Sequence, residues 1–285
     1  MKGLRMKVLN DVLLSMYTTI KIGGRVNEMY FPENVEELIQ LIKEGKAKYC
    51  IGGGSNILAS DRTFETVISL SEFNKKIEDL GAGCYKVGAS VRLQELIRTI
   101  NKAGYGGIEY LISVPGFVGG ATVMNAGGSA EEGNSISDFI LSVECIRDGV
   151  LKDLSKEDCD FSHRNSVFKN KKNYIVTAVT FHFRKQMENQ SLMLREKRLE
   201  YCRLYQDNSA ANFGSVFSCC NMRIMKIIKV LQLVKKRVHF SYKTENWLCN
   251  EGGGTFKEAE KLIRRARLLH RALLKPCCLE VIIWK

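Results

Sequence analysis

The chain has 285 residues, of which 45% are hydrophobic and 26% are charged. This length allows a well-buried core and two domains, and a chain with only three prolines and no low-complexity tract is not a disordered protein. The 43 Lys and Arg residues outnumber the 31 Asp and Glu residues, which gives a formal net charge of +12. Such an excess favours an anionic partner, which could be a phosphorylated substrate, a membrane or a nucleic acid.

Several classes of protein are excluded by what the chain lacks. No apolar segment reaches the roughly 20 residues of a membrane span, and basic residues are not interleaved with aromatic ones as in a nucleic-acid platform. None of the ten cysteines has Cys-x-x-Cys spacing, so no metal site is expected. The adjacent pairs 219–220 and 277–278 are poor disulfide geometry. We therefore expect a reduced, cytoplasmic protein with mostly buried thiols.

Short strands and amphipathic helices alternate in the first third of the chain. The predicted strands lie at residues 27–31, 48–51, 66–70 and 84–88. Apolar residues at helical spacing predict a helix that ends at Gly45, between the first two strands. Ser90 is expected to cap a second helix, which ends at Gly104. The β-α-β order at the start predicts a small α/β subdomain.

The middle of the chain predicts two long strands, at residues 139–147 and 174–183, with a turn at Asp148-Gly149. Between the strands lies a polar segment flanked by aromatic residues, Phe161-Ser-His-Arg-Asn-Ser-Val-Phe168. A charged helix is expected over residues 184–203. This mixture of strands and helices predicts an α+β fold.

The last third predicts two helices and a strand. A helix over residues 222–236 has one apolar and one basic face, and a capping box at Thr255–Glu258 starts the last helix. Pro276 ends that helix, and residues 279–284 form the final strand. Glu280 stands at the head of this strand, before four apolar residues, where a carboxylate needs a partner or a function.

Two glycine-rich turns are the most informative features of the sequence. Residues 113–128 contain five glycines, and residues 51–58 read Ile-Gly-Gly-Gly-Ser-Asn-Ile-Leu. Glycine allows positive φ values and lets the backbone approach a ligand closely. Exposed N–H groups in such turns suit the diphosphate of a nucleotide cofactor, although either turn alone could be a tight turn and nothing more. The apolar run between Gly120 and Asn125 is too short to be assigned to a helix or a strand.

These segments occur in the order found in the UDP-N-acetylenolpyruvoylglucosamine reductase (MurB) family, which the chain resembles from about residue 18 to its end. The matching motifs are Ile22-Gly-Gly24, Gly52-Gly-Gly-Ser-Asn56, Gly107-Ile-Glu-Tyr110, Val114-Pro-Gly-Phe-Val-Gly-Gly-Ala121, Asn125-Ala-Gly127, Arg164-Asn-Ser-Val-Phe168, Gly214-Ser-Val-Phe217, Asn246-Trp-Leu-Cys-Asn250 and Leu279-Glu-Val281. The collinear set is specific, whereas one short motif would not be.

The resemblance implies an α+β fold that begins with a two-part FAD-binding region of the vanillyl-alcohol-oxidase (PCMH) type. Its two subdomains would span residues 1–70 and 71–186. A smaller α+β substrate-binding domain, residues 187–285, would follow, and its last strand would return to the active site. The extra tyrosine loop of the longer family members is absent, because residues 215–250 leave little room for it.

The resemblance also implies an activity: the NADPH-dependent reduction of UDP-N-acetylglucosamine enolpyruvate to UDP-N-acetylmuramate in peptidoglycan precursor synthesis. FAD and NADPH are the implied cofactors, and a UDP-sugar is the implied substrate of a monomeric enzyme. The family's catalytic roles map to three residues. Arg164 and Glu280 would polarise the substrate carboxylate and the developing enolate, and Ser215 would donate the proton.

The implied binding residues fall into two groups. The cofactor-binding positions are Gly52, Gly53, Gly54, Ser55, Asn56, Pro115, Gly116, Gly119, Gly120, Asn125 and Gly127. The substrate-binding positions are His163, Lys243 and Asn246. The basic segment 223–243 could supply cations for the diphosphate and carboxylate of the substrate.

The chain departs from the family pattern mainly in its second half. His163 replaces a tyrosine, Gln206-Asp207 replaces a Gln-Pro, and Ser218-Cys-Cys-Asn221 replaces a Lys-x-Pro segment. The FAD-binding half is therefore better kept than the substrate-binding half. An alternative remains open at this point, namely a paralogue that binds FAD but has lost or changed its substrate and acts as a partner or regulator.

Overall fold

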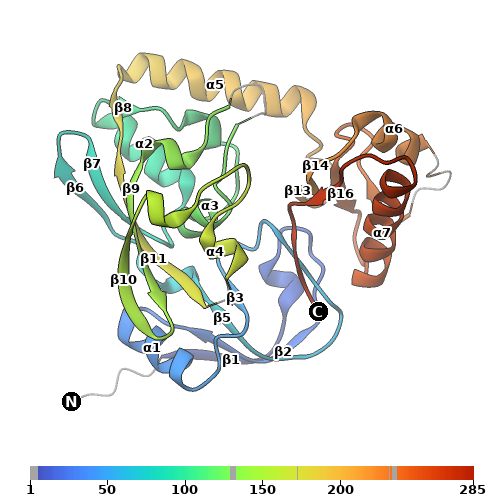
Figure 1. The fold of residues 1–285 in the computed structure, drawn as a ribbon, viewed down its shortest axis with the longest axis horizontal. Coiled ribbons are helices and arrows are strands. Elements are labelled where there is room, and N and C mark those ends of the chain that lie inside the picture. Colours follow the sequence, from blue (N-terminus) through green and yellow to red (C-terminus); the bar gives the residue numbers. More distant parts are fainter. Residues whose placement is uncertain (1–5, 129–132, 172, 231, 233–235) are drawn as a thin grey trace. The chain divides into compact units, whose positions relative to one another are not determined.

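The computed structural model describes residues 6–128, 133–171, 173–230, 232 and 236–285 (Figure 1). Its helices and strands mix in an α+β arrangement, as the sequence predicts. The chain folds into two compact units. Unit 1 consists of Glu28–Gly53, Thr66–Glu200 and the described part of Met1–Leu9, and unit 2 consists of Asn10–Asn27, Gly54–Glu65 and Tyr201–Lys285. The division of the FAD-binding region at residue 70 and the boundary at residue 186 stay predictions.

The first part of the chain forms the predicted β-α-β order. A four-stranded sheet has the order β1-β2-β5-β3, with strands at β1 (Lys7–Leu13), β2 (Arg25–Phe31), β5 (Phe64–Ser69) and β3 (Cys50–Ile51). Helix α1 (Val35–Lys43) begins at Asn34, whose side chain accepts a hydrogen bond from the Glu37 N–H. Strand β3 is shorter than predicted and pairs in parallel with β5.

A five-stranded antiparallel sheet, β10-β9-β11-β7-β6, is the centre of unit 1. Its strands are β6 (Ile77–Gly81), β7 (Cys84–Gly88), β9 (Ile140–Arg147), β10 (Val150–Ser155) and β11 (Tyr174–His182). The predicted strands β7, β9 and β11 are confirmed, and the Asp148-Gly149 turn, with φ values of 53° and 75°, joins β9 to β10 as a tight hairpin. Strands β6 and β10 were not expected, because most of their side chains are exposed and give no apolar pattern.

Three short helices lie against this sheet (Figure 1): α2 (Leu93–Lys102), α3 (Val118–Val123) and α4 (Val167–Asn170). The undecided run after Gly120 is therefore part of a helix, and α3 packs on β7 and β11. The predicted cap of α2 is wrong. Arg92, without a side-chain bond, is the N-cap, because the buried Ser90 hydroxyl donates instead to the Leu70 carbonyl oxygen.

A long helix, α5 (Glu188–Tyr205), follows the sheet of unit 1. It begins four residues later than predicted, because Arg184–Lys185 form strand β12, which pairs with β8 (Tyr105–Gly106). None of the helices in the described ranges is long and apolar enough to cross a membrane.

Unit 2 is built on the antiparallel sheet β13-β16-β15, with strands β13 (Ala211–Ser215), β16 (Trp247–Asn250) and β15 (Val238–Phe240). Helices α6 (Met222–Val230) and α7 (Phe256–Ala272) pack together, and α7 also packs on β15 (Figure 1). The capping box of Thr255 and Glu258 is confirmed. The predicted helix 222–236 ends at Val230 in the described part of the chain, and residues 231 and 233–235 lie outside the described residues.

The last segment of unit 2 is two short strands rather than the single predicted strand. Strand β17 (Cys278–Leu279) pairs antiparallel with β14 (Phe217–Cys219), and β18 (Ile282–Trp284) pairs in parallel with β4 (Ile57–Ala59). Glu280 lies at the break between β17 and β18. The segment thus runs from the Gly214–Phe217 motif to the residues that follow the first glycine turn.

Candidate active site

In unit 1 the two glycine-rich turns approach each other closely. A Cβ atom added at Gly53 would lie 2.8 Å from the Cα of Gly116, closer than real Cβ atoms come. Gly119 is similarly tight: its N–H donates to the Ala89 carbonyl over 2.8 Å, and an added Cβ would lie 2.9 Å from the Ala89 Cβ. Gly53 is therefore required for the backbones of the two turns to meet, and Gly119 for the close packing of the second turn on Ala89.

Gly120 is different, because its surroundings are open. It is exposed at the start of α3, and an added Cβ would meet no protein atom within 4 Å. In the described part of the chain, no acceptor takes the N–H groups of Gly53 and Ser55. Open space over the Gly120 backbone fits a flat ring, and free N–H donors in the other glycine turn fit phosphate groups.

Arg164 is held against the end of the glycine-rich segment. Its guanidinium donates to the carbonyl oxygens of Gly127 and Gly128, each over 3.1 Å. The backbone of Arg164 has φ 54°, a left-handed conformation that is unusual for arginine, inside a turn closed by two 3.1 Å bonds between Ser162 and Asn165. A strained residue in a cluster of polar groups is a reason to suspect function.

Asn125 joins the glycine-rich segment to the same turn. It is buried, has φ 43°, and its side chain donates to the Ser162 carbonyl over 3.0 Å and accepts from the Ser137 N–H over 3.3 Å. The buried Ser166 hydroxyl adds a 2.7 Å bond to the Val123 carbonyl. Unit 1 therefore brings the cofactor-binding positions from Pro115 to Gly127 together with Arg164. His163 lies in the same turn and is exposed.

Unit 2 brings together two other predicted catalytic residues, Ser215 and Glu280. Ser215 ends β13, and the next residue, Val216, accepts hydrogen bonds from the N–H groups of Glu280 (2.9 Å) and Val281 (3.3 Å). Both Ser215 and Glu280 are half-buried. At the break between β17 and β18, the Glu280 backbone is therefore hydrogen-bonded to the residue that follows the serine.

Asn56, a predicted cofactor-binding residue, also contacts this strand break. Its side chain donates to the Glu280 carbonyl over 3.3 Å, and its own carbonyl accepts from the Ile282 N–H over 3.0 Å. The parallel pairing of β4 with β18 begins directly afterwards, at Ile57 and Ile282. The second half of the first glycine turn is therefore attached to Glu280 within unit 2.

Asn246, predicted to bind substrate, holds the backbone beside Ser215. Its amide oxygen accepts from the Phe217 N–H (3.1 Å), its amide nitrogen donates to the Phe217 carbonyl (2.7 Å), and its carbonyl accepts from the Val216 N–H (2.9 Å). A contact of Asn246 with substrate stays a prediction. Lys243 is exposed, and its ammonium group donates to the Arg203 carbonyl, in the last turn of α5, over 2.8 Å.

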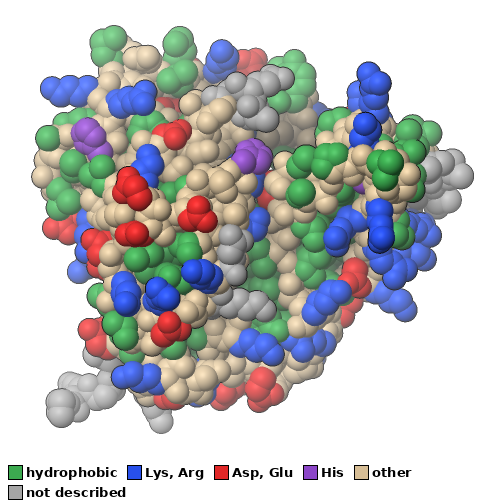
Figure 2. Space-filling model, in the orientation of Figure 1, with side chains coloured by type: hydrophobic (Ala, Val, Ile, Leu, Met, Phe, Trp, Pro, Cys, Tyr) green, Lys and Arg blue, Asp and Glu red, His purple; other side chains and the backbone are tan. Residues whose placement is uncertain are grey.

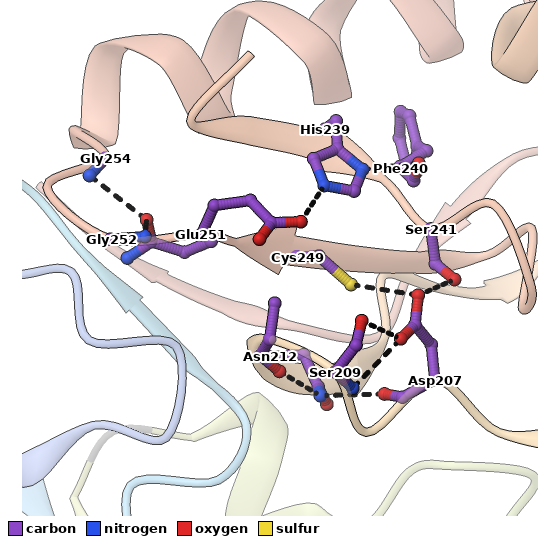
Figure 3. A network of polar contacts seen from close by, with 12 residues as sticks. Asp207, Ser209, Asn212, His239, Phe240, Ser241, Cys249, Glu251, Gly252 and Gly254 are labelled. Atoms are coloured by element: carbon purple, nitrogen blue, oxygen red, sulfur yellow. Dashed lines mark hydrogen bonds and ion pairs between the residues drawn. The ribbon is translucent and has the colours of Figure 1, made fainter. Parts of the chain in front are cut away.

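A buried carboxylate, Asp207, organises the loop that precedes β13. Figure 3 shows Ser209, Ser241 and Cys249 converging on it, with bonds of 2.6 Å from each serine hydroxyl and 3.8 Å from the Cys249 thiol. Burial raises the pKa of Asp207, but the hydrogen bonds from Ser209, Ser241 and Cys249 outweigh burial, so this pKa lies below its ordinary value. Burial and the nearby Asp207 charge raise the pKa of Cys249 to about 12.

Asn212 extends this network to the serine motif. Its amide nitrogen donates to the carbonyl oxygens of Asp207 (3.2 Å) and Ala210 (3.0 Å), and its amide oxygen accepts from the Gly214 N–H over 3.0 Å. Sequence reasoning missed Asn212. The signal was an asparagine two residues before the glycine, since asparagine side chains often bond the backbone two residues ahead.

The cations of unit 2 gather on α7. Figure 2 shows Lys and Arg side chains over the part that carries this helix. The exposed basic residues of α7 are Lys257, Lys261, Arg264, Arg265, Arg267 and Arg271. In the basic segment 223–243, by contrast, Lys229 pairs with Glu245 over 3.1 Å, and Arg237 donates to the Gly253 carbonyl over 3.3 Å. Part of that segment is therefore engaged within unit 2.

The glycine cradle of unit 1 and its surrounding α+β fold define a class, the flavin-binding proteins. Residues 28–154 match a family model described as an FAD binding domain. UDP-N-acetylenolpyruvoylglucosamine reductase from Carboxydothermus hydrogenoformans is 32% identical over 94% of this chain and 90% of its own length. The enzyme of that name from Thermotoga maritima is 32% identical over 88% and 89%. The chain belongs to the UDP-N-acetylenolpyruvoylglucosamine reductase (MurB) family.

A solved structure extends the likeness to the fold. The crystal structure of the MurB reductase from Thermus caldophilus aligns with a TM-score of 0.80 at 25% sequence identity. It covers 98% of this chain and 100% of its own. The similarity therefore includes the divergent second half of the chain.

Proposed function

We propose that this chain is an FAD-containing, NADPH-dependent reductase that converts UDP-N-acetylglucosamine enolpyruvate to UDP-N-acetylmuramate, a step of peptidoglycan precursor synthesis. One observation carries the proposal beyond family membership. In unit 2 the Glu280 N–H donates a hydrogen bond to the carbonyl of Val216, the residue after Ser215. This contact is present even though the segment that begins at Ser218 departs from the family pattern. The elements that the reaction needs are thus kept where the sequence has diverged, which disfavours a paralogue without activity.

The glycine turns hold the flavin in this proposal. Gly53 and Gly116 form the close backbone approach, Gly52 and Pro115 stand beside them in the two turns, and the open face of Gly120 would lie toward the cofactor. FAD held there would supply the hydride chemistry, in which NADPH is the hydride source and the methylene carbon of the enolpyruvyl group is the acceptor. The uncovered N–H groups of Gly53 and Ser55 bind phosphate oxygens, because helix and loop N–H donors in glycine turns favour anions.

The protein's own side chains manage the charge and the proton. Hydride addition leaves negative charge next to the substrate carboxylate, and the Arg164 guanidinium, fixed by the two carbonyl oxygens of Gly127 and Gly128, supplies a cation for it. Glu280 contacts the same carboxylate and enolate in its protonated or ion-paired form, since an ionised carboxylate would repel them.

Ser215 donates the proton to the substrate α-carbon. An alcohol is a weak acid, so it works only when it is held at the reacting atom. Hydrogen bonds to the backbone on either side of the serine support this role. The Asn212 side chain accepts one from the Gly214 N–H, and Asn246 accepts one each from the N–H groups of Val216 and Phe217. His163 and Lys243 are proposed substrate contacts, and the enzyme is proposed to act in the cytoplasm as a monomer.

The test is an anaerobic titration followed by visible absorbance. Purified protein should be yellow, NADPH should bleach it, and UDP-N-acetylglucosamine enolpyruvate should restore the colour. Bleaching without recovery would favour a changed substrate, and a flavin that NADPH never bleaches would favour the non-catalytic paralogue. Protein that takes up no FAD on reconstitution would contradict the proposal at its first step.

A further inference from the structure

The two adjacent cysteine pairs face each other in unit 2. Strands β14 and β17 run antiparallel, and Cys219 is paired with Cys278 across a register shift, a β-bulge or irregularity between Phe217 and Cys219. Cys220 and Cys277 lie one residue beyond the paired strands, and they are near enough that the Cys220 charge contributes to raising the pKa of Cys277. Neither pair can form a disulfide between its own adjacent cysteines with ease, but opposite residues of antiparallel strands have Cα atoms about 4.5–5.5 Å apart. That separation lies within the range of disulfides, about 4.4–6.8 Å.

The two cross-strand pairs differ in their surroundings. Cys219 and Cys278 are both exposed, so an external oxidant can reach them. Cys220 and Cys277 are half-buried and pack against the core that contains Phe217 and Ile263. Burial raises the pKa of Cys220 to about 11 and that of Cys277 to about 11. A thiol must ionise to attack a disulfide, so the inner pair is protected and the outer pair is the accessible one.

The outer pair is close in the chain to the proposed proton donor and its partner. Cys219 is four residues after Ser215, and Cys278 is two residues before Glu280. The backbone hydrogen bonds from Glu280 and Val281 to Val216 lie between the cysteine pair and the serine along the two strands. A covalent bond between the strands at this point would therefore change the spacing of the backbone that carries Ser215 and Glu280.

A metal ion does not account for the four cysteines. Among the residues that the structure describes, no group of three or more His, Cys, Asp or Glu side chains has the arrangement of a metal site. The ten cysteines of the chain are all free thiols. Thiol oxidation is the remaining chemistry that two facing, exposed cysteines support.

We propose that Cys219 and Cys278 form a reversible disulfide that slows the substrate half-reaction. The Cys219 thiolate attacks a low-molecular-weight disulfide and expels one thiolate, which leaves a mixed disulfide on Cys219. The Cys278 thiolate then attacks the Cys219 sulfur and expels the second thiolate. The two protein thiols lose two electrons in total, the small disulfide is reduced to two thiols, and the protons of the two cysteines pass to the expelled thiolates.

The direction of the effect follows from geometry. The strands depart from regular pairing between Phe217 and Cys219, whereas a disulfide would fix the Cβ atoms of Cys219 and Cys278 about 3.8 Å apart, so the bond would shift one strand relative to the other. A misplacement of about 1 Å can reduce a rate by about 100-fold. The effect on turnover rests on the proposed function of Ser215 and Glu280, while formation of the bond does not. Disulfides of this kind in reducing compartments are transient and regulatory.

To test the proposal, the flavin-loaded protein is equilibrated with glutathione disulfide, and the remaining free thiols are blocked with an alkylating reagent. Tryptic peptides are then mapped by mass spectrometry. We expect a bridge between the peptide that contains residues 219–220 and the peptide that contains 277–278. It should persist in Cys220→Ser and disappear in Cys219→Ser and Cys278→Ser. In the oxidised protein, reoxidation of the flavin by substrate should slow by about tenfold or more and recover with dithiothreitol, with bleaching by NADPH unchanged.

Matched variants separate the possible failures. Cys84→Ser removes a half-buried thiol of unit 1 and should respond to oxidation like the natural chain. A bridge that forms only between two molecules, a bridge that survives Cys219→Ser, or a bridge that leaves both half-reactions unchanged would overturn the proposal. If the reduced protein never reoxidises with substrate, the proposed function fails, and the mapped bridge remains an independent result.

Discussion

Replacing the buried Asp207 by asparagine should destabilise unit 2, because the change removes one hydrogen bond and weakens others. Asp207 is only 7% exposed. Its side chain accepts hydrogen bonds from the Ser209 N–H, the Ser209 hydroxyl and the Ser241 hydroxyl. The Ser241 hydroxyl oxygen already accepts from the N–H groups of Lys243 and Thr244, so its hydrogen is directed at Asp207. An amide NH₂ group in place of the second carboxylate oxygen leaves that hydrogen without an acceptor.

The expected size follows from these bonds. Hydrogen bonds to a charged group contribute about 1.5–3 kcal/mol each, so losing one and weakening the others should reduce the free energy of unfolding by about 2–4 kcal/mol. Ser209→Ala removes one donor and keeps the carboxylate, and should lower the free energy of unfolding by about 1 kcal/mol. Both tryptophans, Trp247 and Trp284, belong to unit 2, so urea unfolding followed by tryptophan fluorescence reports on this unit.

The pH dependence gives a sharper check of the same reasoning. Hydrogen bonds hold the pKa of Asp207 below its ordinary value of 3.8, despite burial, which acts in the opposite direction. A lowered pKa in the folded protein contributes stability above the unfolded pKa, and this contribution is lost as the pH falls toward the folded pKa. The difference between the natural chain and Asp207→Asn should therefore be full at neutral pH and shrink below about pH 4. Equal urea midpoints at neutral pH would refute the account.

Three further substitutions test the site. Ser215→Ala should leave bleaching of the flavin by NADPH intact and slow reoxidation by substrate by about 10²–10⁴-fold in stopped-flow absorbance; equal loss in both halves would rule out a proton-donor role. Gly120→Val should yield colourless protein with the unfolding midpoint of the natural apoprotein, because an added Cβ meets no protein atom within 4 Å and the side chain would occupy the cofactor's space; yellow protein would contradict the cradle. Asn246→Ala should lower the free energy of unfolding by about 1–3 kcal/mol through its two bonds to Phe217 and slow reoxidation; a raised KM with unchanged stability would instead favour a direct substrate contact.

Local sequence signals predicted the longer helices and the long strands of unit 1, but not the sheet β13-β16-β15 of unit 2. Apolar periodicity located the strands β7, β9 and β11, and the capping box located the start of α7. The errors arose where tertiary contacts decide. Ser90 has the chemistry of a helix cap, yet Leu70, twenty residues earlier, takes its hydroxyl hydrogen. A residue's local preference cannot reveal a partner that folding brings from elsewhere.

The candidate site divides in the same way. Motifs identified Arg164, Ser215 and Glu280 because the family pattern is collinear, and their roles stay predictions. What motifs could not supply is the backbone support around them. Asn246 forms hydrogen bonds with the residues that follow Ser215 from the turn before β16, and the pairing of Cys219 with Cys278 depends on the register of β14 with β17. Register is a property of pairing, so no single segment of the sequence encodes it.

The pairing of β18 with β4 has a consequence for how the chain folds during synthesis. Residues 282–284 pair with residues 57–59, and Asn250 donates to the Ile20 carbonyl across a similar separation. Such long loops make folding slow, because closure entropy is lost before these contacts form. The whole central sheet of unit 1 is synthesised while Ile57–Ala59 still lack their partner strand β18. Strand β4 therefore stays without its partner until the end of synthesis, and deletion of residues 282–285 should leave it unpaired with β18 in the finished chain.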